Sequence, residues 1–181
     1  MRIITGSAKG AKLLTLEGLE TRPTAERTKE AVFSMLQFDI EGRRVLDLFA
    51  GSGQLSVEAL SRGAESAVLV DSSATSVKVA KANIENCGFA GKARIIQSDY
   101  AAFCAMSRDV FDIVFLDPPY AEGLLLPALK AVLPLLSDYA TVICEHPPEV
   151  ELPESIAGLS VYRTYRYGKV WLTVYRKGVA E

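Results

Sequence analysis

Short apolar runs alternate with helical segments through the middle of the chain, and this alternation constrains the fold more than any other feature. The apolar runs lie at 45–49, 67–70, 93–97, 111–116 and 139–144. The intervening helices are expected at about 55–62, 74–87, 101–106 and 124–136. Strands that alternate with helices imply right-handed βαβ crossovers and a parallel sheet with helices on both faces. The sequence therefore predicts an α/β fold.

The last part of the chain has a different pattern. Residues 160–166 and 169–176 form two runs joined at Tyr167-Gly168, and apolar residues alternate with others in the second run. Two strands with a tight turn between them form a hairpin. A parallel sheet that ends in an antiparallel hairpin is uncommon among dehydrogenases and is the shape expected of a methyltransferase.

The first 42 residues are expected to form a basic arm and a helix that belong to the same domain as residues 43–181. Residues 1–14 indicate a small hairpin or extended arm. Thr24 is a candidate N-cap for a helix that begins near Ala25. Val32, Met35 and Leu36 give that helix an apolar stripe.

Basic residues gather in this N-terminal part. Arg2, Lys9 and Lys12 lie in the arm, while Arg22, Arg27 and Lys29 cluster near the start of the helix. Cations there oppose the helix dipole, so a phosphate partner would explain the cluster, although a solvated helix end is the more common case. Net charge is +2 over residues 1–45, −8 over 46–159 and +4 over 160–181.

The composition excludes several classes of protein. A chain of 181 residues is the size of one domain. No apolar run reaches the roughly 18 residues that span a bilayer, and no signal peptide is evident at the start. Cys87, Cys104 and Cys144 lack the spacing of metal ligands, so they are interpreted as buried free thiols. These observations predict a cytoplasmic protein without a metal site or a membrane partner.

A glycine turn follows the first strand, within Asp47-Leu48-Phe49-Ala50-Gly51-Ser52-Gly53. Glycines at a strand-to-helix turn allow the backbone to approach a ligand closely. The third glycine of the dinucleotide fingerprint is absent, which argues against a dinucleotide; a purely structural turn is the alternative. Asp71 and Asp99 end the next two strands, where a carboxylate accepts ribose hydroxyls or an adenine amine, or else caps a helix.

The fourth strand stops abruptly at Asp117-Pro118-Pro119-Tyr120. Proline cannot continue a strand, so a stiff backbone, a carboxylate and an aromatic ring follow the strand's carboxyl end. Ligands of open α/β sheets bind at that edge. With Asp47, Asp71 and Asp99, four acidic residues meet there, and four independent helix caps are a poor explanation. An anionic rim also suits a cationic ligand.

Together these motifs resemble the class I S-adenosylmethionine-dependent methyltransferases. More closely, the chain resembles the RsmD-type guanine-N2 methyltransferases of bacterial small-subunit (16S) ribosomal RNA. The similarity is found in Arg2-Ile3-Ile4-x-Gly6, Arg22-Pro23-Thr24-x-x-Arg27, Val45–Gly53, Phe115–Tyr120 and Tyr167-Gly168. The resemblance implies a Rossmann-like, mostly parallel seven-stranded sheet, S-adenosylmethionine as cofactor, and 16S ribosomal RNA or the small subunit as partner. A monomer is expected.

The resemblance also assigns roles to residues. Asp47, Gly51 and Gly53 would contact the methionine part of the cofactor, Asp71 its ribose and Asp99 its adenine. The same loops add Phe49, Ala50, Ser72 and Tyr100 to the expected cofactor-binding residues. Asp117, Pro118, Pro119 and Tyr120 would hold the target base. Arg2, Lys9, Lys12, Arg22, Thr24 and Arg27 would bind RNA. Ala11, Gln54 and Ser72-Ser73 depart from the residues common in the family.

The residue types suggest a mechanism. The lone pair of a guanine N2 amine is conjugated into the ring, so the amine is a poor nucleophile. Asp117 and the Pro118 carbonyl could accept its N–H bonds and stabilise positive charge as the methyl group arrives. Tyr120 could stack on an extruded base. His146 is expected in a loop after the fifth strand, with no role, and Trp171 in sheet packing.

Three alternatives stay open. An NAD-type oxidoreductase shares the general fold. A non-catalytic RNA-binding or ribosome-assembly factor would share the basic ends. Another amino methyltransferase, acting on adenine N6 or a glutamine amide, would use the same local chemistry at Asp117.

Overall fold

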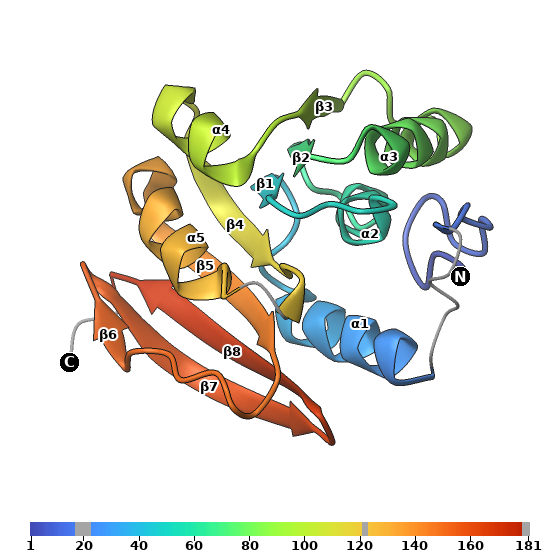
Figure 1. Cartoon of the computed structure of the whole chain (residues 1–181). Helices are drawn as coiled ribbons and strands as arrows, with labels where there is room; N and C mark the ends of the chain where they lie inside the picture. The colour runs from blue at the N-terminus through green and yellow to red at the C-terminus, as the bar shows by residue number, and fades with distance from the viewer. Residues whose placement is uncertain (17–22, 121–122, 179–181) are drawn as a thin grey trace.

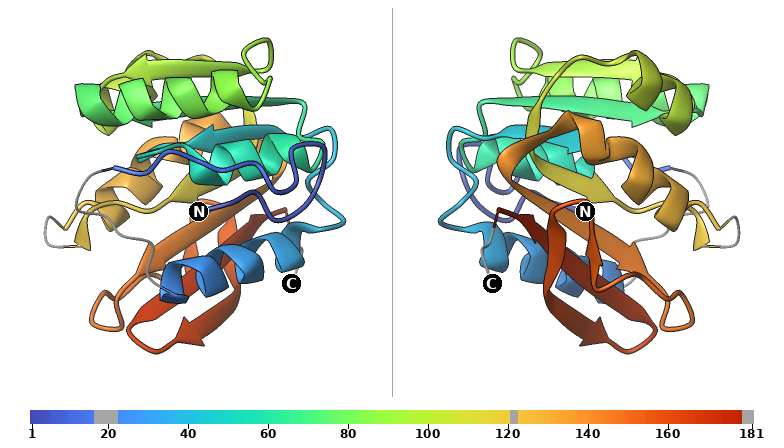
Figure 2. Two further views of the ribbon diagram at one scale, coloured as in Figure 1. Left: turned by 90° about the vertical axis from the view of Figure 1, so that its right-hand side faces the viewer. Right: turned by 90° about the vertical axis from the view of Figure 1, so that its left-hand side faces the viewer.

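A computed structural model describes residues 1–16, 23–120 and 123–178, in which one sheet carries helices on both faces (Figures 1 and 2). The strands are β1 (Arg44–Asp47), β2 (Ser66–Asp71), β3 (Ala93–Gln97), β4 (Phe111–Leu116), β5 (Leu136–His146), β6 (Ser155–Ile156), β7 (Leu159–Tyr167) and β8 (Val170–Lys177). The helices are α1 (Pro23–Leu36), α2 (Gln54–Ser61), α3 (Ala74–Asn86), α4 (Tyr100–Met106) and α5 (Leu125–Val132), which the 3-10 turn η2 (Leu133–Leu135) follows.

The sheet has the order β3-β2-β1-β4-β5-β8-β7-β6. Strands β1 to β5 pair in parallel, whereas β8 pairs antiparallel with both β5 and β7. The predicted α/β class, the parallel half and the terminal hairpin are therefore confirmed. The described sheet has eight strands instead of seven, because the two-residue strand β6 folds back on β7 through a turn at Ala157 and Gly158.

Side chains from alternate strand positions build a separate apolar core on each face of the sheet. One core gathers Val45, Leu69 and Phe115 against α1, α2 and α3. The other gathers Leu46, Val114 and Leu116 against α4 and α5. The strands β1 and β4 are buried on both faces, which explains why they read as continuous apolar runs in the sequence.

The N-terminal arm is a small hairpin docked on the first of these cores. Arg2 and Lys12 form an antiparallel bridge, and the amide of Ile3 donates to the carbonyl of Ala11. The side chains of Ile3 and Leu13 are buried in the same core as α1 and α2. The arm therefore packs against the body of the fold instead of extending into solvent.

Several predicted boundaries change in the structure. Helix α1 begins at Pro23, so Thr24 lies inside the helix and the predicted N-cap is wrong; proline is well suited to a first helical position. The helix predicted to reach Leu136 ends at Val132, because Pro134 cannot continue an α-helix. Strand β5 then takes in the residues on both sides of the predicted 139–144, including His146.

No helix in the described ranges has both the length and the apolar character needed to cross a membrane. Cys104 and Cys144 are buried free thiols, as predicted, whereas Cys87 is only partly buried.

Candidate active site

The carboxyl ends of the central parallel strands bring the predicted acidic residues to one edge of the sheet. Asp47 and Asp71 are the last residues of β1 and β2, Asp117 follows β4, and Asp99 lies two residues beyond β3. Asp47 is in register with Leu69 of β2 and Phe115 of β4. The edge predicted from the sequence therefore exists, and each carboxylate on it has its own set of contacts.

The glycine turn between β1 and α2 is shaped by the fold as much as by any ligand. Gly53 has φ of 78°, and a Cβ atom there would lie 2.9 Å from Leu69 Cδ2 and 3.2 Å from Ala80 Cβ. Only glycine fits this conformation and this contact without strain. Gly51, with φ of 55°, has more space around it, and its amide donates a 2.8 Å hydrogen bond to Asp71 Oδ2.

Asp71 connects the turn to the loop after β2. Its Oδ1 accepts a hydrogen bond from the amide of Ser73, while Oδ2 accepts from Gly51. Ser72 is exposed, and Ser73 caps α3 by accepting a hydrogen bond from the amide of Ser76. Each carboxylate oxygen has a second lone pair, so Asp71 retains the capacity to accept hydrogen bonds from a ribose.

Asp99 is a helix cap. Its Oδ1 accepts hydrogen bonds from the amides of Ala101 and Ala102 at the start of α4, which is the structural alternative considered for this residue. Beside it, the rings of Phe49 and Tyr100 pack with centroids 5.6 Å apart. The two predicted aromatic residues thus meet at this edge and offer a flat apolar surface near an exposed carboxylate.

Asp47 is almost completely buried and accepts a 2.9 Å hydrogen bond from Ser56. Burial raises the pKa of Asp47 to about 7, although the hydrogen bond from Ser56 lowers it and the charge of Asp71 raises it further. At the start of the helix that carries Ser56, Gln54 Oε1 is buried and has no hydrogen-bond partner among the described residues. An unsatisfied acceptor and a buried acid at this end of the sheet fit a ligand that carries a positively charged amine.

Asp117 is placed in similarly unfavourable surroundings for a charge. Burial, and then the charges of Glu145 and Asp47, raise the pKa of Asp117 well above its ordinary value. Pro118 is buried and Pro119 is exposed. Tyr120 is 45% exposed, and its hydroxyl donates a 2.7 Å hydrogen bond to Glu145 Oε1. Burial is also the main cause of the raised pKa of Glu145.

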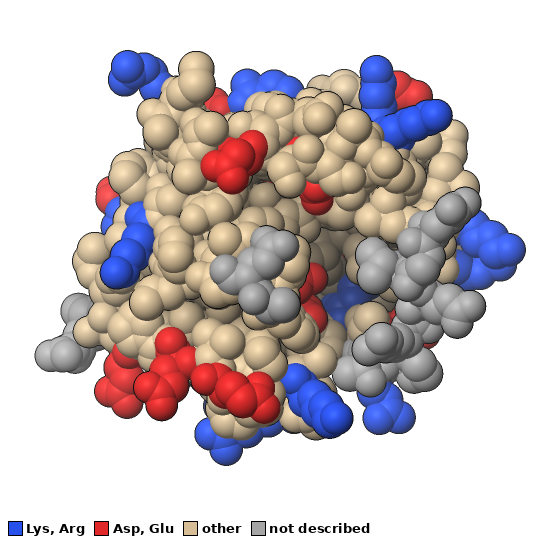
Figure 3. All heavy atoms as spheres, in the orientation of Figure 1, with Lys and Arg blue, Asp and Glu red and all other residues tan. Residues whose placement is uncertain are grey.

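A pocket opens between these carboxylates and helices α1 and α2. It is lined by Ala25, Thr28, Lys29, Val32, Gln54, Leu55, Phe115, Leu116, Asp117, Ile143, Glu145 and Leu172. Figure 3 shows a hollow on this face of the molecule, with acidic and basic atoms visible inside it. The pocket therefore combines an apolar lining with a few polar groups, as small-molecule and base-binding sites do.

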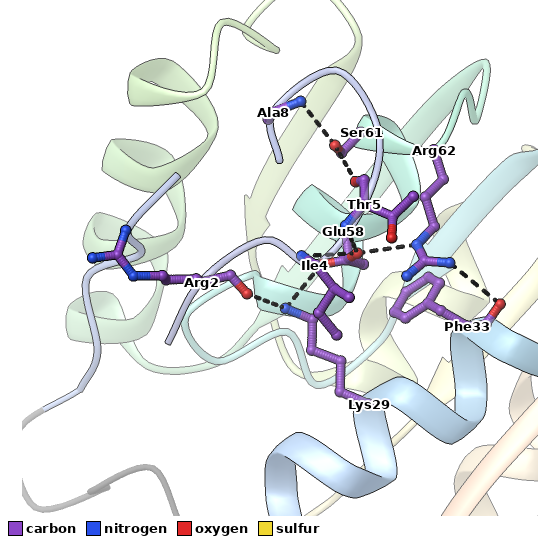
Figure 4. Close-up of polar contacts among 9 residues, drawn as sticks. All are labelled: Arg2, Ile4, Thr5, Ala8, Lys29, Phe33, Glu58, Ser61 and Arg62. Carbon is purple, nitrogen blue, oxygen red and sulfur yellow. Dashed lines mark hydrogen bonds and ion pairs between the residues drawn. The ribbon is translucent and has the colours of Figure 1, made fainter. Parts of the chain in front are cut away.

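The cation in this pocket belongs to a buried ion network (Figure 4). Lys29 Nζ lies 3.0 Å from Glu58 Oε2 and donates to the carbonyl oxygen of Arg2. Glu58 also pairs with Arg62 Nε and accepts hydrogen bonds from the amides of Ile4 and Thr5. One carboxylate on α2 therefore holds both the arm and helix α1 in place.

The residues predicted to bind RNA divide into three groups. Arg2, Lys9, Lys12 and Arg27 lie on the described surface, and Arg2 donates to the carbonyl of Gly10. Arg22 lies outside the described residues, and the side chain of Thr24 is not described. Lys29, which the sequence placed in the same basic cluster, is buried, so it is an internal ion-pair partner and no part of an exposed phosphate-binding surface.

Sequence reasoning missed Glu145 and Glu58, and it placed His146 wrongly. His146 is the last residue of β5 and is buried; its Nδ1 contacts the carbonyl of Pro147 and its Nε2 contacts Thr173. Glu145, at the end of a parallel strand, had the same positional signal as Asp117. Glu58 had no comparable signal, since an isolated acid in a helix is usually solvated.

Within the ranges described, no group of three or more His, Cys, Asp and Glu residues could hold a metal ion.

Comparison with known proteins places these features in context. The model of a family described as Conserved hypothetical protein 95 matches residues 1–176. YlbH of Bacillus subtilis is 39% identical over 98% of this chain and 99% of its own length. The ribosomal RNA small subunit methyltransferase D of Escherichia coli is 35% identical over 98% of this chain and 90% of its own. The solved structure of yhhF from Escherichia coli superposes with a TM-score of 0.89 at 35% identity, over 99% of both chains.

Proposed function

Because the chain belongs to the Conserved hypothetical protein 95 family, we propose that it is an S-adenosylmethionine-dependent ribosomal RNA methyltransferase. Its acceptor is the exocyclic N2 of a guanine in the small-subunit (16S) RNA. The relative from Escherichia coli is named for methylation of small-subunit ribosomal RNA and matches nearly the whole chain. The guanine acceptor rests on the family resemblance and on the chemistry of Asp117.

The observation that most supports this function is the position of Asp117. It stands at the carboxyl end of β4, lines the pocket beside α1, and is close enough to Asp47 for their charges to interact. Asp47 and the glycine turn belong to the cofactor side in this proposal, and the pocket extends from Gln54 on that side to Asp117 and Glu145 on the acceptor side. Asp117 therefore lies where a methyl donor and an amine acceptor would meet.

The residues around the turn fit the cofactor. Gln54 Oε1 is an unsatisfied buried acceptor, and Asp47 is a buried acid, so both suit the ammonium group of a methionine moiety. Asp71 can accept from ribose hydroxyls, while Phe49, Tyr100 and Asp99 surround the place of an adenine. When bound, S-adenosylmethionine supplies a methyl group that is already activated on a sulfonium.

The protein's own part is to position and polarise the amine. Asp117 Oδ and the Pro118 carbonyl accept the amine's N–H bonds, which draws the nitrogen toward tetrahedral geometry and stabilises the charge that develops on it. Proline holds both groups without reorganisation. Burial and the neighbouring acids raise the pKa of Asp117 in the free protein, and amine donors and a cationic cofactor beside it would lower that pKa and favour the ionised form. Alignment of nitrogen, methyl and sulfur provides much of the remaining acceleration.

Tyr120 contributes an aromatic surface at the mouth of the site. Its hydroxyl is held by Glu145, so the ring is fixed, yet the residue remains 45% exposed. Stacking of a flipped base on such a ring is worth roughly 1–3 kcal/mol. The N-terminal 42 residues face the RNA in this proposal, with Arg2, Lys9, Lys12 and Arg27 on the phosphates; Arg22 and Thr24 are further expected RNA-binding residues.

The function is tested by transfer of labelled methyl groups to ribosomal RNA, offered both free and in assembled small subunits. The modified nucleoside is then identified. We expect N2-methylguanosine in small-subunit RNA. Methylated adenine or methylated protein would instead support the alternative amino acceptors, and stabilisation by NAD but not by S-adenosylmethionine in a thermal shift assay would contradict a methyltransferase.

Variants of Asp117 separate catalysis from binding. Asp117→Ala and the isosteric Asp117→Asn are expected to lower the kcat of methyl transfer by about 10²–10³-fold. This is the usual cost of removing a group that stabilises charge in the transition state. RNA binding should be largely kept. Unchanged transfer would remove Asp117 from the mechanism, and a wild-type protein that binds RNA without methylating it would be an assembly factor.

A further inference from the structure

Glu145 lies beside Asp117 at the carboxyl edge of the sheet. Strands β4 and β5 are parallel, and their last registered pair is Leu116 with Cys144. The next residues along the chain are Asp117, just past the end of β4, and Glu145, within β5, and the two lie close enough for their charges to interact. Both side chains line the pocket against α1 and α2.

The carboxylate of Glu145 is held in position by one hydrogen bond and keeps further capacity to accept. Its Oε1 accepts the hydrogen bond from Tyr120, and Oε2 accepts none from the residues that the structure describes. A carboxylate has about four acceptor positions. The pocket therefore presents two acceptor groups side by side, Asp117 and Glu145, and the second has no part in the mechanism given above.

Guanine carries two adjacent donors on its Watson–Crick edge, the N2 amine and N1–H. We propose that Glu145 accepts a hydrogen bond from N1–H while Asp117 accepts from the N2 amine, so that Glu145 determines the choice of guanine. This inference rests on the proposed function and names the residue that selects its substrate. It also gives a reason for placing a second, partly buried acid in a pocket whose chemistry needs only one.

The proposal predicts discrimination between two bases with the same acceptor amine. In 2-aminopurine the N2 amine is present, but N1 has a lone pair and no hydrogen, so a carboxylate at Glu145 would face another acceptor. Adenine likewise presents an unprotonated N1 beside its amine. A charged group left unpaired in this way in the pocket lowers kcat/KM by roughly 10- to 100-fold.

The test measures kcat/KM on a short RNA whose target guanine is kept or replaced by 2-aminopurine. The wild-type protein should favour guanine at least about 10-fold. Glu145→Gln should narrow or reverse that preference, because an amide can donate to the unprotonated N1 while its carbonyl still accepts from Tyr120. Glu145→Ala should bring the ratio toward one. Glu149→Gln, an exposed acid four residues away, should behave as the wild type.

The outcomes separate the inference from the function on which it rests. A wild-type protein that methylates guanine and 2-aminopurine equally, or a Glu145→Gln variant that slows both bases by the same factor, would overturn the role of Glu145 and leave the guanine-N2 activity intact. A wild-type protein that methylates neither base in any small-subunit RNA would refute the proposed function, and the inference with it.

Discussion

Lys29 and Glu58 form an ion pair of 3.0 Å in which the two side chains are only 2% and 0% exposed. The pair joins α1 to α2, and through the amides of Ile4 and Thr5 it also holds the N-terminal arm (Figure 4). Lys29 lines the acceptor pocket as well. The basic arm and the wall of the pocket therefore depend on the same buried carboxylate.

Removing this carboxylate should destabilise the protein strongly. In Glu58→Gln, Lys29 is left as an uncompensated buried charge, which typically costs about 3–5 kcal/mol of unfolding free energy. Asp109→Asn is the matched control, because it breaks an ion pair with Arg94 whose side chains are 58% and 43% exposed, and such pairs contribute about 0–1 kcal/mol. Urea denaturation measures both; similar losses would mean that the buried network contributes no more than a surface pair.

The acid limb of the stability curve gives a second readout for Glu58. Burial alone would raise its pKa, but the hydrogen bond from Ile4 and the interactions with Lys29 and Arg62 lower it below the ordinary value. A lowered carboxyl pKa stabilises the fold above the unfolded pKa, and this stabilisation is lost as the pH falls through the folded pKa. Glu58→Gln should therefore show a shallower loss of stability in acid.

Cofactor binding should depend on pH through Asp47, whose pKa is raised to about 7 mainly by burial. Below that pH the free protein holds a proton that an ammonium ligand must displace. Affinity for S-adenosylmethionine should rise with pH, by up to about tenfold per unit, and level off above about pH 7. Calorimetry in two buffers of different ionisation enthalpy should detect the released proton. Asp47→Asn should bind weakly, with no such pH dependence.

The same raised pKa makes the folding stability of the free protein fall as the pH rises, whereas cofactor affinity rises. Since the folded state keeps the proton of Asp47 longer than the unfolded state, stability should fall as the pH rises from about 4 to 7, and change little above 7. Asp47→Asn should flatten that part of the curve. A steep curve in the variant would assign the pH dependence to other groups.

Two glycines with almost the same φ separate backbone strain from packing. Gly53 has φ of 78° and no room for a Cβ atom, whereas Gly88 has φ of 79° and no neighbour within 4 Å of that position. Gly88→Ala should cost about 1 kcal/mol for its left-handed conformation. Gly53→Ala should cost about 1–3 kcal/mol more, because Leu69 and Ala80 must move. Equal losses in urea denaturation would show that the neighbours adapt freely.

The arm should contribute to RNA affinity through its exposed charges. Replacing both Lys9 and Lys12 by glutamine should weaken binding and reduce the slope of log K against log salt by roughly 0.7–0.9 for each phosphate that the variant no longer neutralises. Lys78 and Lys81, exposed on α3, provide the matched double replacement by glutamine and should leave the slope unchanged. An equal weakening by both double replacements would indicate a general effect of net charge instead of specific binding by the arm.

The strands and the cofactor edge could be predicted because their signals are local. The predicted strands 93–97 and 111–116 match β3 and β4 residue for residue, since continuous apolar runs and proline stops need no tertiary information. The convergence of Asp47, Asp71 and Asp117 followed from the rule that parallel strands end at one edge. The pairing of β6 with β7 was missed because β6 has only two residues, and the burial of His146 did not follow because it depends on the distant strand β8.

The sequence by itself therefore determined the α/β class, the parallel direction of the central strands and the edge where the acidic residues meet. Only the tertiary structure decided that Lys29 is an internal partner of Glu58 and that Glu145 stands beside Asp117. The reason is physical. Secondary structure and turns depend on residues near in sequence, whereas a buried ion pair and a register between strands depend on segments about 30 residues apart, which the chain brings together only when its apolar faces pack.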